Sequence, residues 1–262
     1  MKRGCGSNRS PSPCKFGIRI DMSNEKIPVL CHTFNKESNF NSRIAIMKKT
    51  SLRALPEIKL AQLQTLQVGN DCAVHSIVAA TELLTGTKLD PAEIIDEINH
   101  IWWRGRFYRL APNSGITPPL QVRLTRYLAK KHNLPLTAKQ LHLTPELLRA
   151  TAEAENLACL VTIYWWFGKA PAIYYKEQPR NFNQLSGAGG HTMLFAAYDT
   201  EHRSGEAQTP WGFINSWINA GTGLFWMEDA GFRKAWGLPI PRWGKNAAVI
   251  ISLENGNKLE TI

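Results

Sequence analysis

Cys72 stands at a position where the sequence could form a reactive thiolate. Gly69, Asn70 and Asp71 directly before it are typical of a loop, and apolar residues at helical spacing follow it. The first backbone N–H groups of a helix have no partner within the helix, and the helix dipole adds partial positive charge at that end. Both effects lower the pKa of a cysteine thiol. Cys72 is therefore a candidate nucleophile, although a small buried residue that begins a helix would give the same pattern.

His191 is the candidate base for such a nucleophile. It follows Gly189 and Gly190 and precedes an apolar segment that is typical of a strand. A nucleophilic cysteine is most often paired with a histidine, and an imidazole beside backbone that bears no side chains is well placed in a cleft. We expect the two glycines to line that cleft. A lone histidine would more simply be a hydrogen-bonded core residue, so the assignment depends on its partners.

Asn215 is the candidate group that orients the base. It ends a predicted strand and is followed by Ser216 and Trp217. Its side-chain oxygen can accept a hydrogen bond from an imidazole, which is the third role in a catalytic triad. Trp217 could shield that bond from water and line the substrate cleft. Taken alone, the segment is equally typical of a turn asparagine beside core tryptophans.

The three segments together are more specific than any one of them. His191 and Asn215 follow Cys72 by 119 and 143 residues, which is close to the spacing in papain-type enzymes. The sequence resembles the papain superfamily of cysteine peptidases, including its C39-like bacterial branches, over roughly residues 62–253. The resemblance is carried by three stretches: Gln67 to Cys72 before a helix, Gly190-His191 before an apolar strand that ends in Tyr198-Asp199, and Asn215-Ser216-Trp217 before Gly223 to Trp226.

The resemblance implies an α+β, papain-like fold with a helical N-terminal lobe, an antiparallel β-sheet C-terminal lobe and a cleft between them. It implies that Gln67, with Gln64 as the reserve, forms an oxyanion hole with the backbone N–H of Cys72. A thiolate–imidazolium pair would then attack a peptide carbonyl, His191 would protonate the leaving amine, and water would release the acyl group. No metal or cofactor is needed. Ala73 and Ile218 depart from the family pattern and put its usual specificity in doubt.

The local patterns also predict helices first and strands second, which is typical of α+β proteins. Apolar residues at helical spacing, followed by Gly86, predict a helix over residues 72–85. Capping residues predict further helices that begin at Pro91, Pro118 and Pro145. Strands are predicted over residues 158–166, 192–198, 212–217, 223–227 and 247–253.

The domain boundaries follow from changes in composition. We expect a flexible leader over residues 1–24, an arm or propeptide-like segment over 25–60, and a catalytic domain over 61–262. Within that domain, the helical lobe should cover about 61–155 and the β lobe about 156–255.

Charge, cysteine content and apolar runs limit the partners and the location that we expect for the protein. The net charge is +10, but the basic residues are scattered and no base-reading motif occurs, so we expect no nucleic-acid partner. Five cysteines indicate free thiols in a reducing compartment, and Cys14, Cys31 and His32 give at most a faint metal site. No signal-like apolar stretch follows Met1 and no apolar run spans a bilayer. We expect a monomer that is cytoplasmic or exported without a Sec signal.

Two alternatives to a peptidase remain. The same triad could deamidate a glutamine side chain or transfer an acyl group, as papain-fold bacterial effectors delivered into host cells do. The fold could also serve as a binding module that has lost its activity. In each case the partner is a protein or peptide.

Overall fold

The computed structural model describes residues 49–100, 115–166, 170–180, 189–217, 223–240 and 243–254. These residues belong to one compact unit, Ile46–Ile262. The predicted leader and residues 25–48 of the predicted arm lie outside the described residues, and so do Cys14, Cys31 and His32. The lobe boundaries remain predictions.

The four predicted helix starts are confirmed. Gly86, with a φ of +73°, ends the helix that begins at Cys72, and the carboxylate of Asp90 accepts from Ala92 N–H at the start of the next helix. The hydroxyl of Thr144 accepts from Leu147 N–H. The helices are α2 (Glu57–Ala61), α3 (Cys72–Thr85), α4 (Pro91–His100), α5 (Pro118–Lys131), α6 (Pro145–Thr151) and α7 (Asp229–Trp236), with a short 3-10 turn η1 (Leu52–Ala54).

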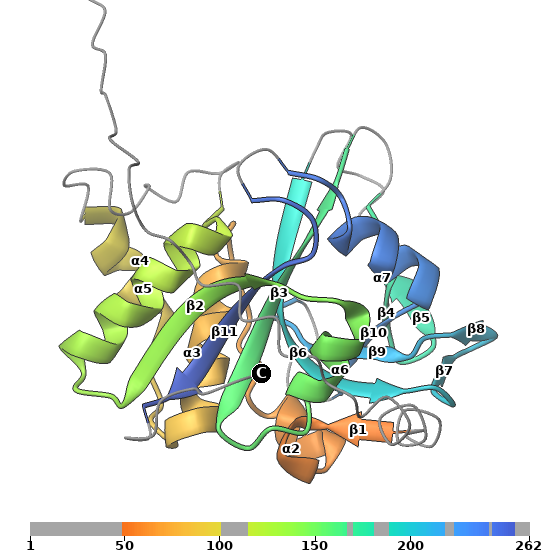
Figure 1. The fold of residues 1–262 in the computed structure, drawn as a ribbon, viewed down its shortest axis with the longest axis horizontal. Helices are drawn as coiled ribbons and strands as arrows, with labels where there is room; N and C mark the ends of the chain where they lie inside the picture. The colour runs from red at the N-terminus through yellow and green to blue at the C-terminus, as the bar shows by residue number, and fades with distance from the viewer. Residues whose placement is uncertain are drawn as a thin grey trace, which may run out of the picture. The chain divides into compact units, whose positions relative to one another are not determined.

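A nine-stranded antiparallel sheet forms the centre of the described unit (Figure 1). Its order is β2-β11-β3-β6-β9-β10-β4-β5, and β1 pairs with β6. The strands are β1 (Lys49–Ser51), β2 (Leu136–His142), β3 (Leu157–Trp165), β4 (Ile173–Tyr175), β5 (Gln178–Arg180), β6 (Gly189–Asp199), β9 (Trp211–Ile214), β10 (Phe225–Met227) and β11 (Ala247–Leu253), with a separate ribbon of β7 (Arg203–Ser204) and β8 (Ala207–Gln208). The predicted α+β class is confirmed.

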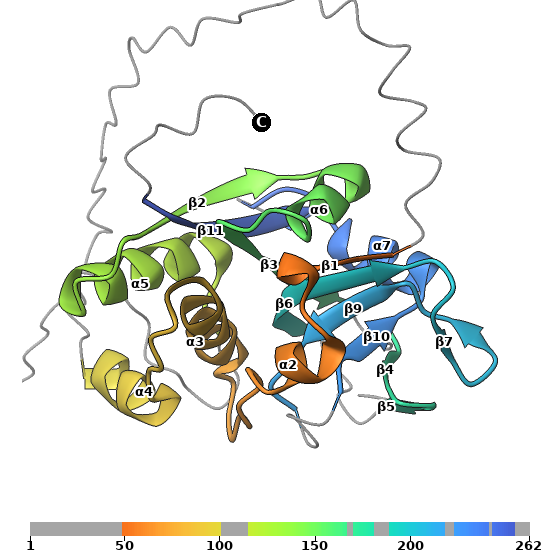
Figure 2. The same ribbon diagram turned by 90° about the horizontal axis from the view of Figure 1, so that it is seen from below.

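Both faces of the sheet are covered, so its central strands β3, β6 and β11 are largely buried and mostly apolar. Along β3, Ala158 and Leu160 pack into a core with α3, α4 and α5, which Figure 2 shows gathered on one side of the sheet. Cys159, Val161 and Ile163 pack into a second core with α6 and α7. This alternation is the period of two expected for a strand.

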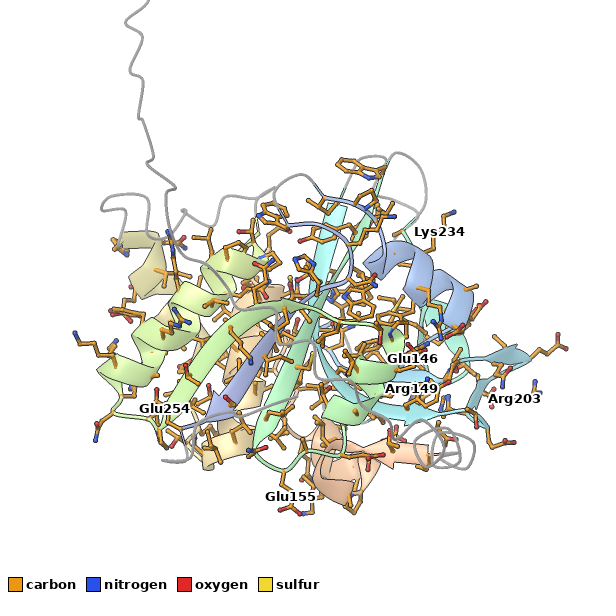
Figure 3. The ribbon with its side chains drawn as sticks, viewed as in Figure 1. Glu146, Arg149, Glu155, Arg203, Lys234 and Glu254 are labelled. Atoms are coloured by element: carbon orange, nitrogen blue, oxygen red, sulfur yellow. The ribbon has the colours of Figure 1, made fainter. Side chains whose placement is uncertain are left out.

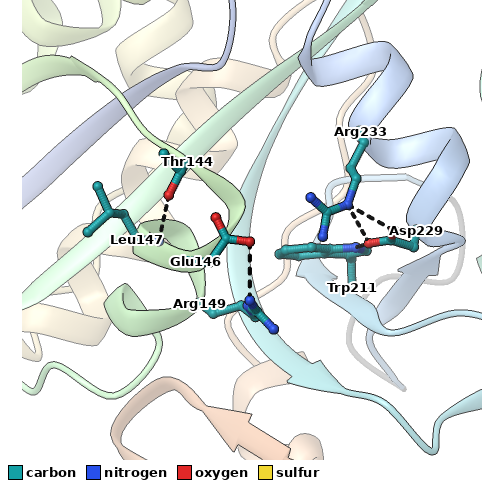
Figure 4. Close-up of polar contacts among 7 residues, drawn as sticks. All are labelled: Thr144, Glu146, Leu147, Arg149, Trp211, Asp229 and Arg233. Atoms are coloured by element: carbon teal, nitrogen blue, oxygen red, sulfur yellow. Dashed lines mark hydrogen bonds and ion pairs between the residues drawn. The ribbon is translucent and has the colours of Figure 1, made fainter. Parts of the chain in front are cut away.

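The carboxylate of Asp229 links helix α7 to strand β9. Asp229 accepts from the indole N–H of Trp211 at 2.9 Å and from Arg233 at 2.8 Å (Figure 4). The Arg233 guanidinium lies 5.9 Å from the Trp211 ring centroid. Among the labelled charged side chains of Figure 3, Lys234 and Arg203 point outward from the body.

Some sequence-based boundaries were wrong. The edge strand β2 was not among the predicted strands, and its partner β11 lies more than a hundred residues later in the sequence. Strand β6 begins at Gly189, so His191 lies inside it and not before it. Strand β9 ends at Ile214, where the Asn215 side chain accepts from Ser216 N–H and turns the chain. No helix of the described residues has the length and apolar content to cross a membrane.

Candidate active site

Cys72 begins α3 and faces a pocket, with only 9% of its surface exposed. The backbone N–H of Thr192 donates to its sulfur at 3.4 Å. Burial raises the pKa of the Cys72 thiol, the Thr192 N–H acts in the opposite direction, and the negative charge of Asp71 adds to the rise. The sequence predicts a lowered pKa from the helix N-terminus. The structure corrects that expectation because burial of the sulfur outweighs the N–H groups around it.

His191 and Asn215 are joined by a hydrogen bond. The Nε2 atom of His191 and the Oδ1 atom of Asn215 are 2.7 Å apart, and the same oxygen accepts from Ser216 N–H at 2.7 Å. Because an amide oxygen only accepts, His191 carries its proton on Nε2, and Nδ1 holds the lone pair of the neutral ring. The Trp217 ring stacks on the imidazole with centroids 4.2 Å apart. Burial lowers the pKa of His191 to about 4, against the opposing effect of the Asn215 bond.

Two contacts bring the nucleophile helix to the strand of the base. Thr192, whose N–H reaches the sulfur of Cys72, is the next residue after His191. The hydroxyl of Ser76, one turn along α3, lies within hydrogen-bond distance of the backbone carbonyls of both Cys72 (2.9 Å) and Thr192 (3.1 Å). The N-terminus of α3 is therefore fixed against β6 by hydrogen-bonding groups on both elements.

Gln67 lies on the loop before Cys72 and is held by the segment after Asn215. Its backbone N–H donates to Ser216 O at 2.7 Å, and its side-chain oxygen accepts from the Ser216 hydroxyl at 2.5 Å. Its Nε2 donates to Gly69 O at 2.7 Å. The reserve candidate, Gln64, is buried and donates to Gly223 O.

A second buried histidine lies behind the loop that carries Gln67. The Nδ1 atom of His75 is 2.6 Å from the hydroxyl of Thr65, and its Nε2 is 3.7 Å from the carboxylate of Asp71. Burial would raise the pKa of Asp71, but the hydrogen bond and charge of His75 and backbone N–H groups outweigh it, so this pKa is lowered. This arrangement anchors the loop directly before the nucleophile.

A pocket of about 300 Å³ opens beside Cys72. Its walls come from three places: the turn before α5, the ends of β3 and β6, and the segment before β11. The lining residues other than Cys72 are Gly115, Ile116, Thr117, Thr162, Tyr164, Trp165, Trp166, Gly189, Gly190, Thr192, Ile240 and Trp243. Trp217 is stacked over the His191 ring and is not among them.

Gly189 and Gly190 make room for aromatic rings of the neighbouring strand. They pair with Trp165 and Tyr164 across β3 and β6. A Cβ on Gly189 would overlap the Trp165 ring, and a Cβ on Gly190 would lie 2.9 Å from the ring of Tyr164. The two glycines before His191 are therefore required by the pocket wall.

Sequence reasoning missed several residues of the site. Tyr164, which stacks on Trp243, and the hydroxyls of Thr162 and Thr192 lie in predicted strands but carried no signal of their own. Gln121 sits behind them on α5 and reaches both threonines. An uncharged glutamine within an amphipathic helix gives no indication of such a role.

Among the described residues, no group of three or more His, Cys, Asp or Glu side chains could hold a metal ion. The candidate site consists of a buried cysteine and, on the adjacent strand, a buried histidine that is hydrogen-bonded to Asn215.

Comparisons with known proteins give matches of structure alone. No family model matches the sequence, and no curated protein matches it. One similar solved structure is a protein of Bacillus anthracis assigned as a C39-like peptidase, at 16% identity and a TM-score of 0.44, covering 77% of this chain and 96% of that one. Another is xylellain, a cysteine protease from Xylella fastidiosa, at 12% identity and a TM-score of 0.39, covering 78% and 85%. These likenesses are of fold, so the case for the site rests on the geometry of this chain.

Proposed function

We propose that the protein is a thiol hydrolase, specifically a cysteine peptidase, with Cys72 as nucleophile, His191 as base and Asn215 as the group that orients the base. The observation that carries this proposal is the set of contacts around His191. Its ring is bonded to Asn215 on one side, and the N–H of the next residue, Thr192, donates to the Cys72 sulfur. Attack by a cysteine nucleophile needs a cysteine at a helix N-terminus, a histidine and an acceptor that orients the histidine.

The pKa shifts favour a neutral resting pair over the ion pair that the sequence suggests. Burial raises the pKa of the Cys72 thiol and lowers the pKa of His191 to about 4. We therefore propose that Nδ1 of His191 takes the thiol proton as the sulfur attacks a substrate carbonyl. The carbon–sulfur bond forms, and the carbonyl π electrons move to the oxygen.

The remaining steps return the proton. In the proposal, the Cys72 N–H and the side-chain amide of Gln67 donate to the oxyanion. His191 then gives its proton to the leaving nitrogen as the carbon–nitrogen bond breaks. Water, deprotonated by the same imidazole, attacks the thioester carbon. The carbon–sulfur bond then breaks, the acid is released, and the imidazolium returns its proton to the Cys72 sulfur. The stacked Trp217 and the bond to Asn215 hold the ring in one orientation through both proton transfers.

The pocket supports a polypeptide substrate with a large apolar side chain near the reacting carbonyl. Its walls are mostly aromatic and aliphatic, and its volume of about 300 Å³ suits one such side chain with adjoining backbone. An unfolded protein presents many such sequences and is the appropriate first substrate.

The proposal is tested by incubating the protein with a carboxymethylated, unfolded protein and measuring product masses. The wild type is expected to produce fragments with new termini, and Cys72→Ser to produce none. Cys159→Ser is the matched control, because Cys159 is also buried but lies on β3 in the core of α6 and α7. Intact substrate with mass increases of about one dalton would indicate deamidation. Unchanged masses would reject the hydrolase.

A further inference from the structure

Gln121 on α5 is a fully buried polar side chain that the proposed reaction does not use. Burying an amide costs free energy unless its hydrogen-bonding groups find partners. Its Nε2 lies 3.0 Å from the backbone oxygen of Ile116, 3.2 Å from the hydroxyl of Thr162 and 3.0 Å from the hydroxyl of Thr192. All three acceptors belong to residues that line the pocket beside Cys72. Gln121 therefore links the turn before α5 to the ends of β3 and β6 in the pocket wall.

Thr192 connects the Gln121 side chain to the sulfur of Cys72. We call the hydrogen bond from the Gln121 amide to the Thr192 hydroxyl the tie. Thr162 and Thr192 are partners across β3 and β6, and their hydroxyls lie 3.0 Å apart. The N–H of Thr192 donates to Cys72, while its carbonyl accepts from Ser76. Fixing the Thr192 side chain therefore restrains the peptide whose N–H faces the sulfur. The same peptide follows His191, so the restraint also acts on the backbone of the base.

We propose that Gln121 is a positioning residue, whose amide holds Thr192 so that the Thr192 N–H stays directed at the Cys72 sulfur as charge develops there. The inference rests on the proposed function, in which that sulfur is the nucleophile. The Oε1 atom of Gln121 is buried and has no hydrogen-bond partner among the described residues. A leucine or methionine would fill the same space without leaving such an atom. Gln121 is therefore less favourable for stability than an apolar residue of the same size. Its hydrogen bond to Thr192 explains why a glutamine occupies this position.

The test is the rate at which iodoacetamide alkylates Cys72, followed by peptide mass spectrometry over a range of pH. Gln121→Leu and Thr192→Val each remove one end of the tie. Each is expected to slow alkylation at neutral pH by about threefold to tenfold, because a hydrogen bond to the thiolate weakens. The pH profile of the alkylation rate should move to higher pH by roughly half a unit to one unit. The double variant is expected to match the single variants, because both changes break the same tie.

Two controls separate positioning from general loss of stability. Thr125→Val removes another buried hydroxyl of α5, which bonds to the backbone carbonyl of Gln121 and to no pocket wall. It is expected to keep the wild-type profile even if its melting temperature falls. Thr192→Ser keeps the hydroxyl and should restore the wild-type profile.

The proposal is overturned if Gln121→Leu leaves the profile unchanged, or if Thr125→Val changes it equally. Thr192→Val tests the same tie should Gln121→Leu fail to fold. Failure of the proposed function is a separate result. A wild-type protein that cleaves nothing would reject the peptidase, whereas the ratio of variant to wild-type alkylation rates would still report on the tie.

Discussion

At the scale of residues, the proposed reaction depends on the protonation states of Cys72 and His191. Both side chains are buried, and burial disfavours the charged form of each. The bond to Asn215 and the Thr192 N–H oppose that effect without removing it. The proposed reaction therefore starts from a thiol and a neutral imidazole, which is the form of His191 that can accept a proton.

Asn215→Ala is expected to lower kcat by about 10- to 100-fold, equivalent to roughly 1.4–2.7 kcal/mol in the barrier, because the imidazole loses its fixed orientation. KM should change little, since Asn215 does not line the pocket. Steady-state kinetics on a cleaved peptide separate the two parameters. A variant that raised KM and left kcat intact would contradict the role given to Asn215.

The lowered pKa of His191 also predicts how stability depends on pH. Its folded-state pKa of about 4 lies below the ordinary value of 6.5, so between these values the unfolded chain binds one more proton than the folded protein. Stability therefore falls as the pH is lowered from about 6.5 towards 4, by up to roughly 3 kcal/mol from this group. Urea unfolding at pH 7 and pH 4.5 should show a larger loss for the wild type than for His191→Gln. Equal losses would contradict burial of a neutral ring.

At the scale of elements, the site depends on how β6 meets β3 and α3. Gly189 and Gly190 allow Trp165 and Tyr164 to lie across β6, and Ser76 fixes α3 against the same strand. The strand thus carries the base and a pocket wall on one short segment.

Gly189→Ala is expected to destabilise the protein by about 1–3 kcal/mol, because the new methyl group overlaps the Trp165 ring, which must move to admit it. Gly231→Ala is the matched control on α7, where an added Cβ has nothing within 4 Å. Alanine should stabilise that helix by roughly 0.5–1 kcal/mol. Urea unfolding measures both changes, and a neutral Gly189→Ala would contradict the close packing of the Trp165 ring on Gly189.

The sequence predicts those elements whose signals are local. The start of α3 at Cys72 and its end at Gly86 follow from a loop, an apolar period and a glycine, and β11 is apolar along its length. The edge strand β2 is too polar to recognise without its partner β11, and α7 lacks a side-chain cap at Glu228. Both depend on contacts made only in the folded chain.

The same distinction applies to the candidate site. The order and spacing of Cys72, His191 and Asn215 are visible in the sequence, whereas the tie from Gln121 to Thr192 exists only because the sheet register places Thr162 opposite Thr192. The raised pKa of Cys72 was missed for a related reason. Burial is a property of the folded chain, and a helix start alone predicts the opposite direction.

At the scale of the described unit, two apolar cores share one sheet. One contains α3, α4 and α5, and the other contains α6 and α7. Because β3 and β6 contribute residues to both, neither core can form fully without the other. The candidate site lies at the ends of these two strands.

Leu124→Ala on α5 and Phe232→Ala on α7 test this coupling. Both side chains are fully buried, on opposite faces of the sheet. Each variant is expected to lose about 3–5 kcal/mol of stability and to shift a single unfolding transition. Near-UV and far-UV circular dichroism should report the same midpoint. Two separate transitions in either variant would show that the faces unfold independently.

The most direct test of the central claim is covalent labelling by a peptidyl epoxide, mapped by mass spectrometry at pH 6. We predict selective modification of Cys72 in the wild type and its loss in His191→Ala, since the imidazole must take the thiol proton as the sulfur opens the ring. Cys159, whose pKa is raised to about 12 by burial, should stay unmodified. Labelling of Cys72 at the same rate without His191 would contradict a Cys72–His191 pair acting as nucleophile and base. Slow and equal labelling of Cys72 and Cys159 would contradict it as well.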